Sequence, residues 1–400
     1  MIKSLTCSRM LRTFAIPAIL PILAAVSLGV SLLSAVRVEA QGVQTEIGGE
    51  EIVTLTRKPI SKTRPEFTSV TVMPGRGMEL LYVTANFPGK GEFQVLRSPD
   101  LAMAENLLDH RDNAYGSLST SMGAAFLVPY PNRIAGSLSS DGKTITTSWQ
   151  GRTVTLPVDA GRIPTLDEGV SMHGLIQKDQ AEDIRVTDMP GGEQVTGVLR
   201  DAFHGQWFSK TNLVITISLT AEAVDARVVA DNVGRHSEPI AIAWHPYLRL
   251  PSGQRAQARV RIPASMVAEK IGNRYWPNLP TGKLLPVAGT RFDLRAPGGV
   301  PLGNNHFDDN WSHLDWKNGA VTVQVIDPAA HYGVDIEALS PQIRTIQMYS
   351  PETAKFVAVE DQYNFVDPFG KEWHGMNTGM VELKPGQSTR WRVRLHVFVP

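Results

Sequence analysis

The chain has 400 residues, of which 42% are hydrophobic and 20% charged, and its 39 basic side chains balance its 39 acidic ones. This composition excludes a disordered, collagen-like or coiled-coil chain, and a formal net charge of zero gives no reason to expect a nucleic-acid partner. The 34 glycines and 27 prolines are spread along the chain, which favours many short strands joined by turns over long helices.

The first 40 residues have the layout of a secretory signal peptide. Basic side chains and no acidic ones precede an uncharged, mostly apolar stretch from Phe14 to Val36, and a cleavage-like Val38-Glu39-Ala40 follows. We therefore expect cleavage after Ala40 and an exported protein, either periplasmic or secreted. The apolar stretch is long enough to span a bilayer, so a retained single anchor is the alternative.

Residues 41–400 are expected to form a single domain, because no linker, low-complexity tract or fixed-period repeat interrupts them. The only cysteine, Cys7, lies in the N-terminal segment, which excludes disulfide bonds, thiolate zinc sites and a cysteine nucleophile from the rest of the chain. The histidines do not pair at metal-ligand spacings, and no phosphate-binding glycine motif is present, so the sequence supports no metal site.

One helix is clear in the sequence. Ser98 is suited to cap it, Pro99 suits its first turn, and the apolar residues of 101–108 have helical spacing.

The other signals predict strands. Residues 144–150 and 153–157 flank Gly151-Arg152 and are expected to form a hairpin. Further strands are expected at 213–220, 226–232, 256–262, 321–326, 334–339, 343–349, 356–360, 380–383 and 391–399. Many short strands with turns between them are typical of a sandwich or barrel, so we expect one large all-β antiparallel domain over about 45–400.

Five strings place polar side chains among apolar or proline residues. They are PYPNRI at 129–134, HGLI at 173–176, WHPYLRL at 244–250, FDDNW at 307–311 and KFVAVEDQY at 355–363. In the first, Arg133 is either a solvated side chain at an edge turn or a rigidly placed donor for hydroxyl or carboxylate oxygens. In the second, His173 is either structural or able to approach a ligand closely, because Gly174 leaves room beside it.

The remaining strings offer further titratable groups. His245 ends an apolar strand between two aromatic residues and suits the core or a site equally. Asp308 belongs to an Asx-rich loop or to a ligand site. Alternation places Phe356, Ala358 and Glu360 on one face of a strand, so Glu360 is either a rim residue or a placed base.

In this order, the five strings resemble segments of the aldose 1-epimerase (galactose mutarotase-like) family over roughly residues 120–400. The stretch NLPTGKLLPVAGTRFDLR at 278–295 and the closing GMVELKPGQS at 379–388 are similar to family segments as well. The resemblance implies a large antiparallel β-supersandwich and an isomerase that interconverts the α and β anomers of a hexose without a metal or organic cofactor.

The resemblance also implies roles for individual residues. Glu360 matches the base that takes the proton of the sugar C1 hydroxyl, and His245 matches the acid that protonates the ring oxygen. The residues implied to bind the sugar are Asn132, Arg133, His173 and Asp308. We further expect Trp244 or Trp311 to supply an apolar platform for one face of the sugar.

Two departures from the family pattern lie near these residues. Asp361 follows Glu360 where the family usually has proline, and residues 364–370 replace a Pro-Asp-Ala-Phe segment. These departures keep open a second class of function, that of a non-catalytic exported protein that binds carbohydrate. A sugar-phosphate epimerase would need a basic cluster at the pocket mouth, and a lyase acting on acidic polysaccharide is a further alternative. The expected partner is a small sugar, with no nucleic acid and no membrane beyond the N-terminal anchor.

Overall fold

The computed structural model describes residues 45–108, 118–160, 162–163, 167–272 and 277–400, and these belong to one compact unit. The predicted signal peptide at 1–40 lies outside the described residues. Within the described ranges, no helix has the length and apolar character needed to cross a membrane.

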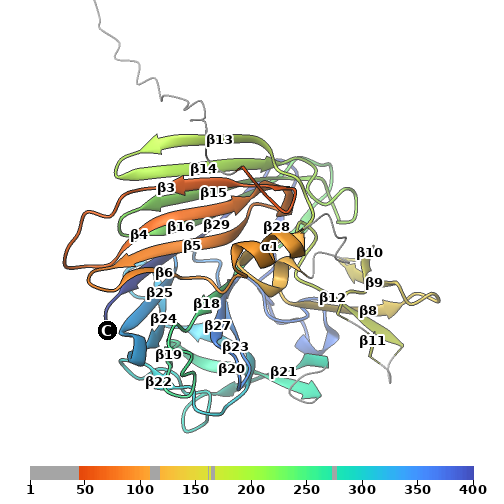
Figure 1. The fold of residues 1–400 in the computed structure, drawn as a ribbon. Helices are drawn as coiled ribbons and strands as arrows, with labels where there is room; N and C mark the ends of the chain where they lie inside the picture. The colour runs from red at the N-terminus through yellow and green to blue at the C-terminus, as the bar shows by residue number, and fades with distance from the viewer. Residues whose placement is uncertain (1–44, 109–117, 161, 164–166, 273–276) are drawn as a thin grey trace, which may run out of the picture. The chain divides into compact units, whose positions relative to one another are not determined.

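Two large sheets contain most of the strands (Figure 1). The nine-stranded sheet consists, in spatial order, of β13 (Glu182–Met189), β14 (Gly192–Leu199), β15 (Thr211–Thr220), β16 (Val224–Asn232), β29 (Ser388–Phe398), β25 (Tyr332–Ala338), β24 (Val321–Asp327), β19 (Arg259–Arg261) and β22 (Val300–Pro301). The eleven-stranded sheet consists of β21 (Pro277–Pro286), β20 (Ala264–Gly272), β23 (Phe307–Leu314), β26 (Thr345–Ser350), β27 (Phe356–Gln362), β18 (Ala243–Arg249), β7 (Ala124–Leu127), β5 (Glu79–Phe87), β4 (Glu66–Met73) and β3 (Val53–Thr56), with β6 (Gly91–Gln94) paired to β5.

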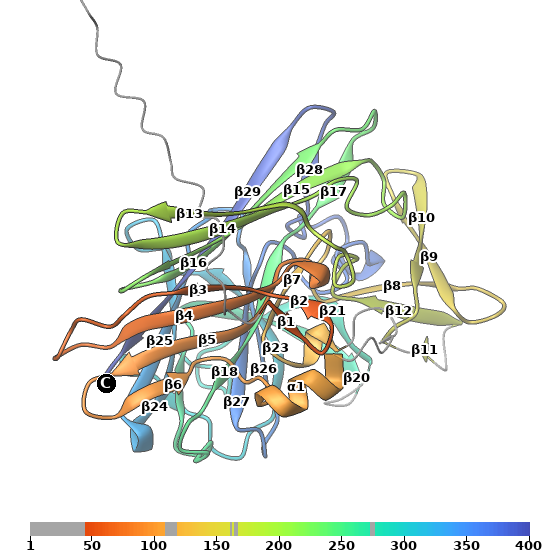
Figure 2. The same ribbon diagram turned by 45° about the horizontal axis from the view of Figure 1, so that its top comes forward.

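A five-stranded sheet lies to one side of the two large ones in both views (Figures 1 and 2). It consists of β10 (Arg152–Pro157), β9 (Thr144–Trp149), β8 (Arg133–Leu138), β12 (Glu168–Met172) and β11 (Arg162–Ile163). Two short pairs complete the set, β1 (Glu46–Ile47) with β2 (Glu50–Glu51) and β17 (Glu238–Ile240) with β28 (Val381–Leu383). The neighbouring strands of the two large sheets pair antiparallel, which confirms the predicted fold class.

The two large sheets pack against each other through their apolar faces. Trp391 of β29 lies with its ring centroid 6.2 Å from that of Phe126 on β7, and its Nε1 donates to the carbonyl of Asp361 on β27 at 3.0 Å. Val357 and Val359 of β27 are fully buried in the same apolar cluster. Because side chains alternate along a strand, Glu360 of β27 faces away from this core.

The predicted hairpin is present, with Trp149 of β9 opposite Arg152 of β10. The strand expected at 256–262 is shorter than predicted, since β19 covers only Arg259–Arg261. The residues before it form a turn, in which the Ala258 amide donates to the Gln254 carbonyl at 3.2 Å.

The predicted helix is also present, as α1 (Leu101–Leu108), but its predicted cap is wrong. Asp100 Oδ1 accepts from the Met103 amide at 2.9 Å, whereas the Ser98 hydroxyl donates to the Leu81 carbonyl. A capping side chain must directly precede the first helical residue to reach the free amides, and Ser98 stands too far back. The other helical segments of the described ranges are the 3₁₀ turns η1 (Pro74–Arg76), η3 (Ser119–Ser121), η4 (Pro328–Ala330) and η5 (Lys371–Trp373).

Candidate active site

One pocket of about 250 Å³ gathers the side chains that the sequence analysis named as catalytic or sugar-binding, which are Asn132, Arg133, His173, His245, Asp308 and Glu360. Its wall is completed by Thr120, Met172, Tyr247, His306, Gln347 and Tyr349. Strands β18, β23, β26 and β27 supply one side, and the ends of β8 and β12 supply the other. The volume is close to the lower end of ligand pockets, roughly 300–1,000 Å³, so it suits a small ligand.

Strand register brings His245 and Glu360 together. β18 and β27 are antiparallel neighbours in which Tyr247 lies opposite Ala358 and Leu248 opposite Val357. The same register, continued by two residues, places His245 opposite Glu360. Facing side chains on neighbouring strands lie close enough to interact, so residues 115 apart in the chain meet as direct neighbours.

The two side chains are in close contact and almost completely buried. His245 Nε2 lies 3.2 Å from Glu360 Oε1, with side-chain exposures of 4% and 2%. The other carboxylate oxygen of Glu360 accepts from Gln362 Nε2 at 2.7 Å, and Gln362 is itself fully buried. The carboxyl group is therefore held between an amide that orients it and an imidazole that can exchange a proton with it.

Burial displaces the pKa values of this pair in opposite directions. Loss of solvation raises the pKa of Glu360 to about 8, aided by the nearby charge of Asp308 and opposed by Gln362 and Arg133. Loss of solvation lowers the pKa of His245 to about 4. Between these values the two groups hold a single proton, which can sit on either side of the 3.2 Å contact.

Arg133 is oriented from both sides. Its Nη1 donates to Asn132 Oδ1 at 2.8 Å, and its Nη2 lies 3.4 Å from Asp308 Oδ2. The other oxygen of Asp308 accepts from Gln347 Nε2 at 2.8 Å. This chain of contacts places a cationic fork and a carboxylate on the pocket wall, where both can bind hydroxyl groups.

His173 stands beside His245, with ring centroids 5.1 Å apart and planes nearly perpendicular at 89°. Burial lowers the pKa of His173 far below its ordinary value, and the neighbouring His245 and Arg133 act in the same direction. The imidazole is therefore neutral at pH 7 and can both donate and accept hydrogen bonds.

Gly174 serves packing rather than ligand access. A Cβ at this position would lie 2.3 Å from the Val128 carbonyl oxygen, and its φ of 84° is in the left-handed region. At this close approach the Leu175 amide donates to the same Val128 carbonyl at 2.8 Å. The expectation that Gly174 makes room for a ligand is corrected accordingly, because the space is filled by backbone.

The segment that departs from the family pattern supports the strand that carries Arg133. The Asp367 amide donates to the Arg133 carbonyl at 2.8 Å, and Asp367 Oδ1 accepts from the Ala135 amide at 3.0 Å. Asn364 Nδ2 donates to the Pro131 carbonyl at 3.3 Å. Asp361, in contrast, does not line the pocket, since it faces the opposite side of β27 from Glu360.

We predict that Asp367→Ala weakens both the fold and sugar binding. It leaves the amide of the half-buried Ala135 without its acceptor, which costs about 1 kcal/mol, and alanine tolerates the φ of 48° at this position poorly. Urea unfolding should show this loss of stability. Sugar titration should show a larger dissociation constant, because the strand that carries Arg133 loses its support and the guanidinium moves. Asp367→Asn keeps the acceptor and tolerates the backbone conformation, so an equal loss in this variant would contradict the assignment.

The aromatic platform predicted from the sequence is wrong. Trp244 and Trp311 are 1% and 0% exposed, and their indole nitrogens donate to the carbonyls of Ala124 and Phe292, both at 2.9 Å. Residues an odd number apart in a strand point to opposite faces of the sheet. Trp244 is one residue before His245 and Trp311 is three after Asp308, so both tryptophans point into the core while His245 and Asp308 face the pocket.

Two tyrosines line the pocket instead. Tyr247 lies 4.7 Å, centroid to centroid, from the His245 ring, and Tyr349 lies 6.0 Å from Phe356. Tyr247 lies two residues after His245 in the WHPYLRL segment, and this spacing is the sequence signal that places both side chains on the same face of the strand. Gln347 and Tyr349 carried no such local signal, since only the pairing of β26 with β27 puts Gln347 opposite Glu360.

Among the residues that the structure describes, no group of three or more His, Cys, Asp or Glu side chains is arranged to hold a metal ion. The titratable groups of the pocket instead contact one another, as Arg133 does Asp308 and His245 does Glu360.

Solved structures share this fold at low sequence identity. A galactose mutarotase-like protein from Clostridium acetobutylicum matches with a TM-score of 0.66 at 15% identity, over 88% of this chain and 96% of that one. An aldose epimerase homologue from C. elegans matches with a TM-score of 0.63 at 16% identity, over 88% of this chain and 100% of that one. A galactose 1-epimerase from Lactobacillus acidophilus matches with a TM-score of 0.59 at 14% identity, over 87% of this chain and 98% of that one.

No curated protein sequence gives a significant match to the chain. The aldose 1-epimerase family model, in contrast, matches residues 91–396, which include the whole of the pocket described above. With a match over this length and a galactose mutarotase-like fold, the chain belongs to the aldose 1-epimerase family.

Proposed function

We propose that this protein is an aldose 1-epimerase that interconverts the α and β anomers of a free hexose by opening and reclosing the pyranose ring. The observation that supports this most directly is the 3.2 Å contact between His245 Nε2 and Glu360 Oε1 in a buried pocket. Ring opening requires one base and one acid, and these two groups hold one proton between them.

The proposed reaction moves two protons. Glu360 takes the proton of the C1 hydroxyl, while His245 gives a proton to the ring oxygen, and the bond between C1 and the ring oxygen breaks. The product is an open-chain aldehyde, which rotates about the C1–C2 bond and exposes its other face. Reclosure reverses both transfers, so the pair returns to its starting state without an outside reagent.

The active microstate has an ionised Glu360 and a protonated His245, whereas burial of the empty pocket favours the neutral forms of both. Bound sugar supplies the compensating hydrogen bonds, since the C1 hydroxyl donates to the carboxylate and the ring oxygen accepts from the imidazolium. Arg133 and Asp308 bind other hydroxyls of the same ring and hold it in this orientation.

The proposal is tested by polarimetry on freshly dissolved α-anomers of several aldoses. The full chain should speed relaxation to the equilibrium rotation without changing the equilibrium value. If a sugar binds in calorimetry but its relaxation is no faster than in buffer alone, the protein is a carbohydrate-binding member of the family and the proposed activity is refuted.

The pH dependence of kcat/KM should be bell-shaped, with limbs near pH 4 and pH 8. Below about pH 4 both His245 and Glu360 carry protons, so no base remains for the C1 hydroxyl. Above about pH 8 neither carries one, so no acid remains for the ring oxygen. Initial rates from pH 3.5 to 9.5, corrected for buffer catalysis, measure both limbs, and a rate that keeps rising above pH 9 would contradict the shared proton.

A further inference from the structure

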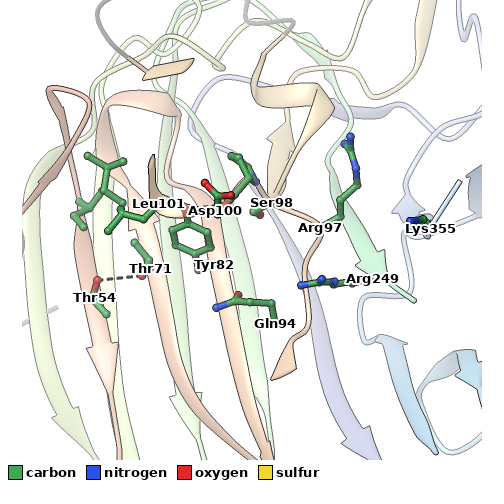
Figure 3. Close-up of a pocket in the computed structure, with 13 residues that line it drawn as sticks. Thr54, Thr71, Tyr82, Gln94, Arg97, Ser98, Asp100, Leu101, Arg249 and Lys355 are labelled. Atoms are coloured by element: carbon green, nitrogen blue, oxygen red, sulfur yellow. Dashed lines mark hydrogen bonds between the residues drawn. The ribbon is translucent and has the colours of Figure 1, made fainter. Parts of the chain in front are cut away.

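A second pocket, separate from the candidate active site, lies over one face of the eleven-stranded sheet, at the end formed by β3, β4, β5 and β6 (Figure 3). Strands β3, β4, β5 and β6 each contribute a side chain, and residues 97–101 at the start of α1 close one side. Its volume is about 800 Å³, compared with about 250 Å³ for the candidate active site. This is large enough for a ligand of several rings.

Three cationic side chains line one side of this pocket, Arg97, Arg249 and Lys355, and they lie together in Figure 3. Arg249 and Lys355 form no ion pair with any residue that the structure describes, and both are exposed. Arg97 donates to the Ser121 carbonyl at 2.5 Å. The one acidic residue in the lining, Asp100, already caps α1, so the pocket carries an excess of positive charge.

The opposite side is neutral and mixed in character. Thr54 and Thr71 present hydroxyl groups that bond to each other at 3.1 Å, and Tyr82 donates to the Pro99 carbonyl at 3.0 Å. Leu101, which is exposed, contributes apolar surface beside them, and the largely buried Ile47 and Ile52 form the base of this side. Hydroxyl groups next to apolar surface match the two kinds of surface that a sugar ring presents.

We propose that this pocket binds an acidic oligosaccharide, a short chain of sugars that carries carboxylate groups. The carboxylates pair with Arg97, Arg249 and Lys355, and the sugar rings lie along the neutral side. The choice of a saccharide over other anions rests on the proposed function of the neighbouring pocket. The two pockets share a wall, because the Arg97 guanidinium lies 5.9 Å from the centroid of the Tyr247 ring, which lines the candidate active site.

The test is calorimetric titration of the full chain with trimeric galacturonate, reduced at its aldehyde end so that it is no longer an aldose. The fully methyl-esterified trimer has the same length without the charges. We expect the acidic trimer to bind at least tenfold more tightly than the ester at low ionic strength, and its binding to weaken with added salt. Equal affinity for the two trimers, or no binding of either, would overturn the proposal.

The double variant Arg249→Gln/Lys355→Gln should bind the acidic trimer at least tenfold more weakly. Both side chains are exposed, so the fold is expected to persist. A matched control, Arg235→Gln/Lys384→Gln, removes two exposed cations that do not line the pocket and should bind as the unmodified chain does. Equal losses in both double variants would indicate a general charge effect and overturn the assignment.

Mutarotation assays separate this proposal from the proposed activity. The double variant should relax free hexose anomers at the unmodified rate, and Glu360→Gln should keep its affinity for the acidic trimer. A chain that binds the trimer but does not accelerate mutarotation refutes the epimerase and supports the second site. A chain that accelerates mutarotation but ignores the trimer refutes the second site alone.

Discussion

Replacing Glu360 with Gln is expected to reduce catalysed mutarotation roughly 100- to 10,000-fold, the usual contribution of one general base. The amide has nearly the same shape and still accepts from Gln362, but it cannot take a proton from the C1 hydroxyl. Because burial already favours the neutral form of Glu360, the melting temperature should change little. Polarimetric rates on an α-anomer, with thermal melts of both proteins, measure the two effects.

Asp361→Asn is the matched control for this variant. It makes the same chemical change one residue along β27, on the face that points away from the pocket. Both oxygens of Asp361 are buried without a hydrogen-bond partner among the described residues, and burial raises the pKa of this carboxyl to about 8. The group is therefore mostly neutral at pH 7, and its amide should keep both stability and rate. Full activity in Glu360→Gln would exclude Glu360 as the base.

Replacing His245 with Gln should cause a loss of similar size, roughly 100- to 10,000-fold, because the ring oxygen loses its proton donor. Any residual rate should no longer show the acidic limb near pH 4, which we assign to His245. The double variant His245→Gln/Glu360→Gln should be about as slow as either single variant. The two groups act as one unit, so their effects on the rate are not additive.

His236→Gln provides the control, because this histidine is exposed and does not line the pocket. It should leave both the rate and the pH profile unchanged. A His245→Gln variant that keeps the limb near pH 4, or a double variant far slower than both single variants, would show that the two side chains work independently.

Local sequence signals predicted the all-β fold class, because strands and tight turns each leave a short-range pattern in the sequence. Alternating apolar residues marked β15 and β27, and the Gly151-Arg152 turn marked the hairpin of β9 and β10. Element ends were less well predicted, since they depend on hydrogen bonds beyond the local pattern. The cap of α1 at Asp100 and the short β19 show this.

The sequence by itself showed that His245 and Glu360 are titratable groups at the ends of apolar strands, which left a structural role and a site role open for each. The resemblance to the aldose 1-epimerase family then implied their roles as acid and base. Only the tertiary structure decided which side chains meet. The antiparallel register of β18 and β27 brings this pair together. Side chains alternate between the two faces of β18, so Trp244, next to His245, is buried in the core. The second pocket combines residues from 47–101 with Arg249 and Lys355, which no local pattern connects. Strand pairing is a long-range choice made by the packing of whole sheets, so single segments of sequence do not specify it.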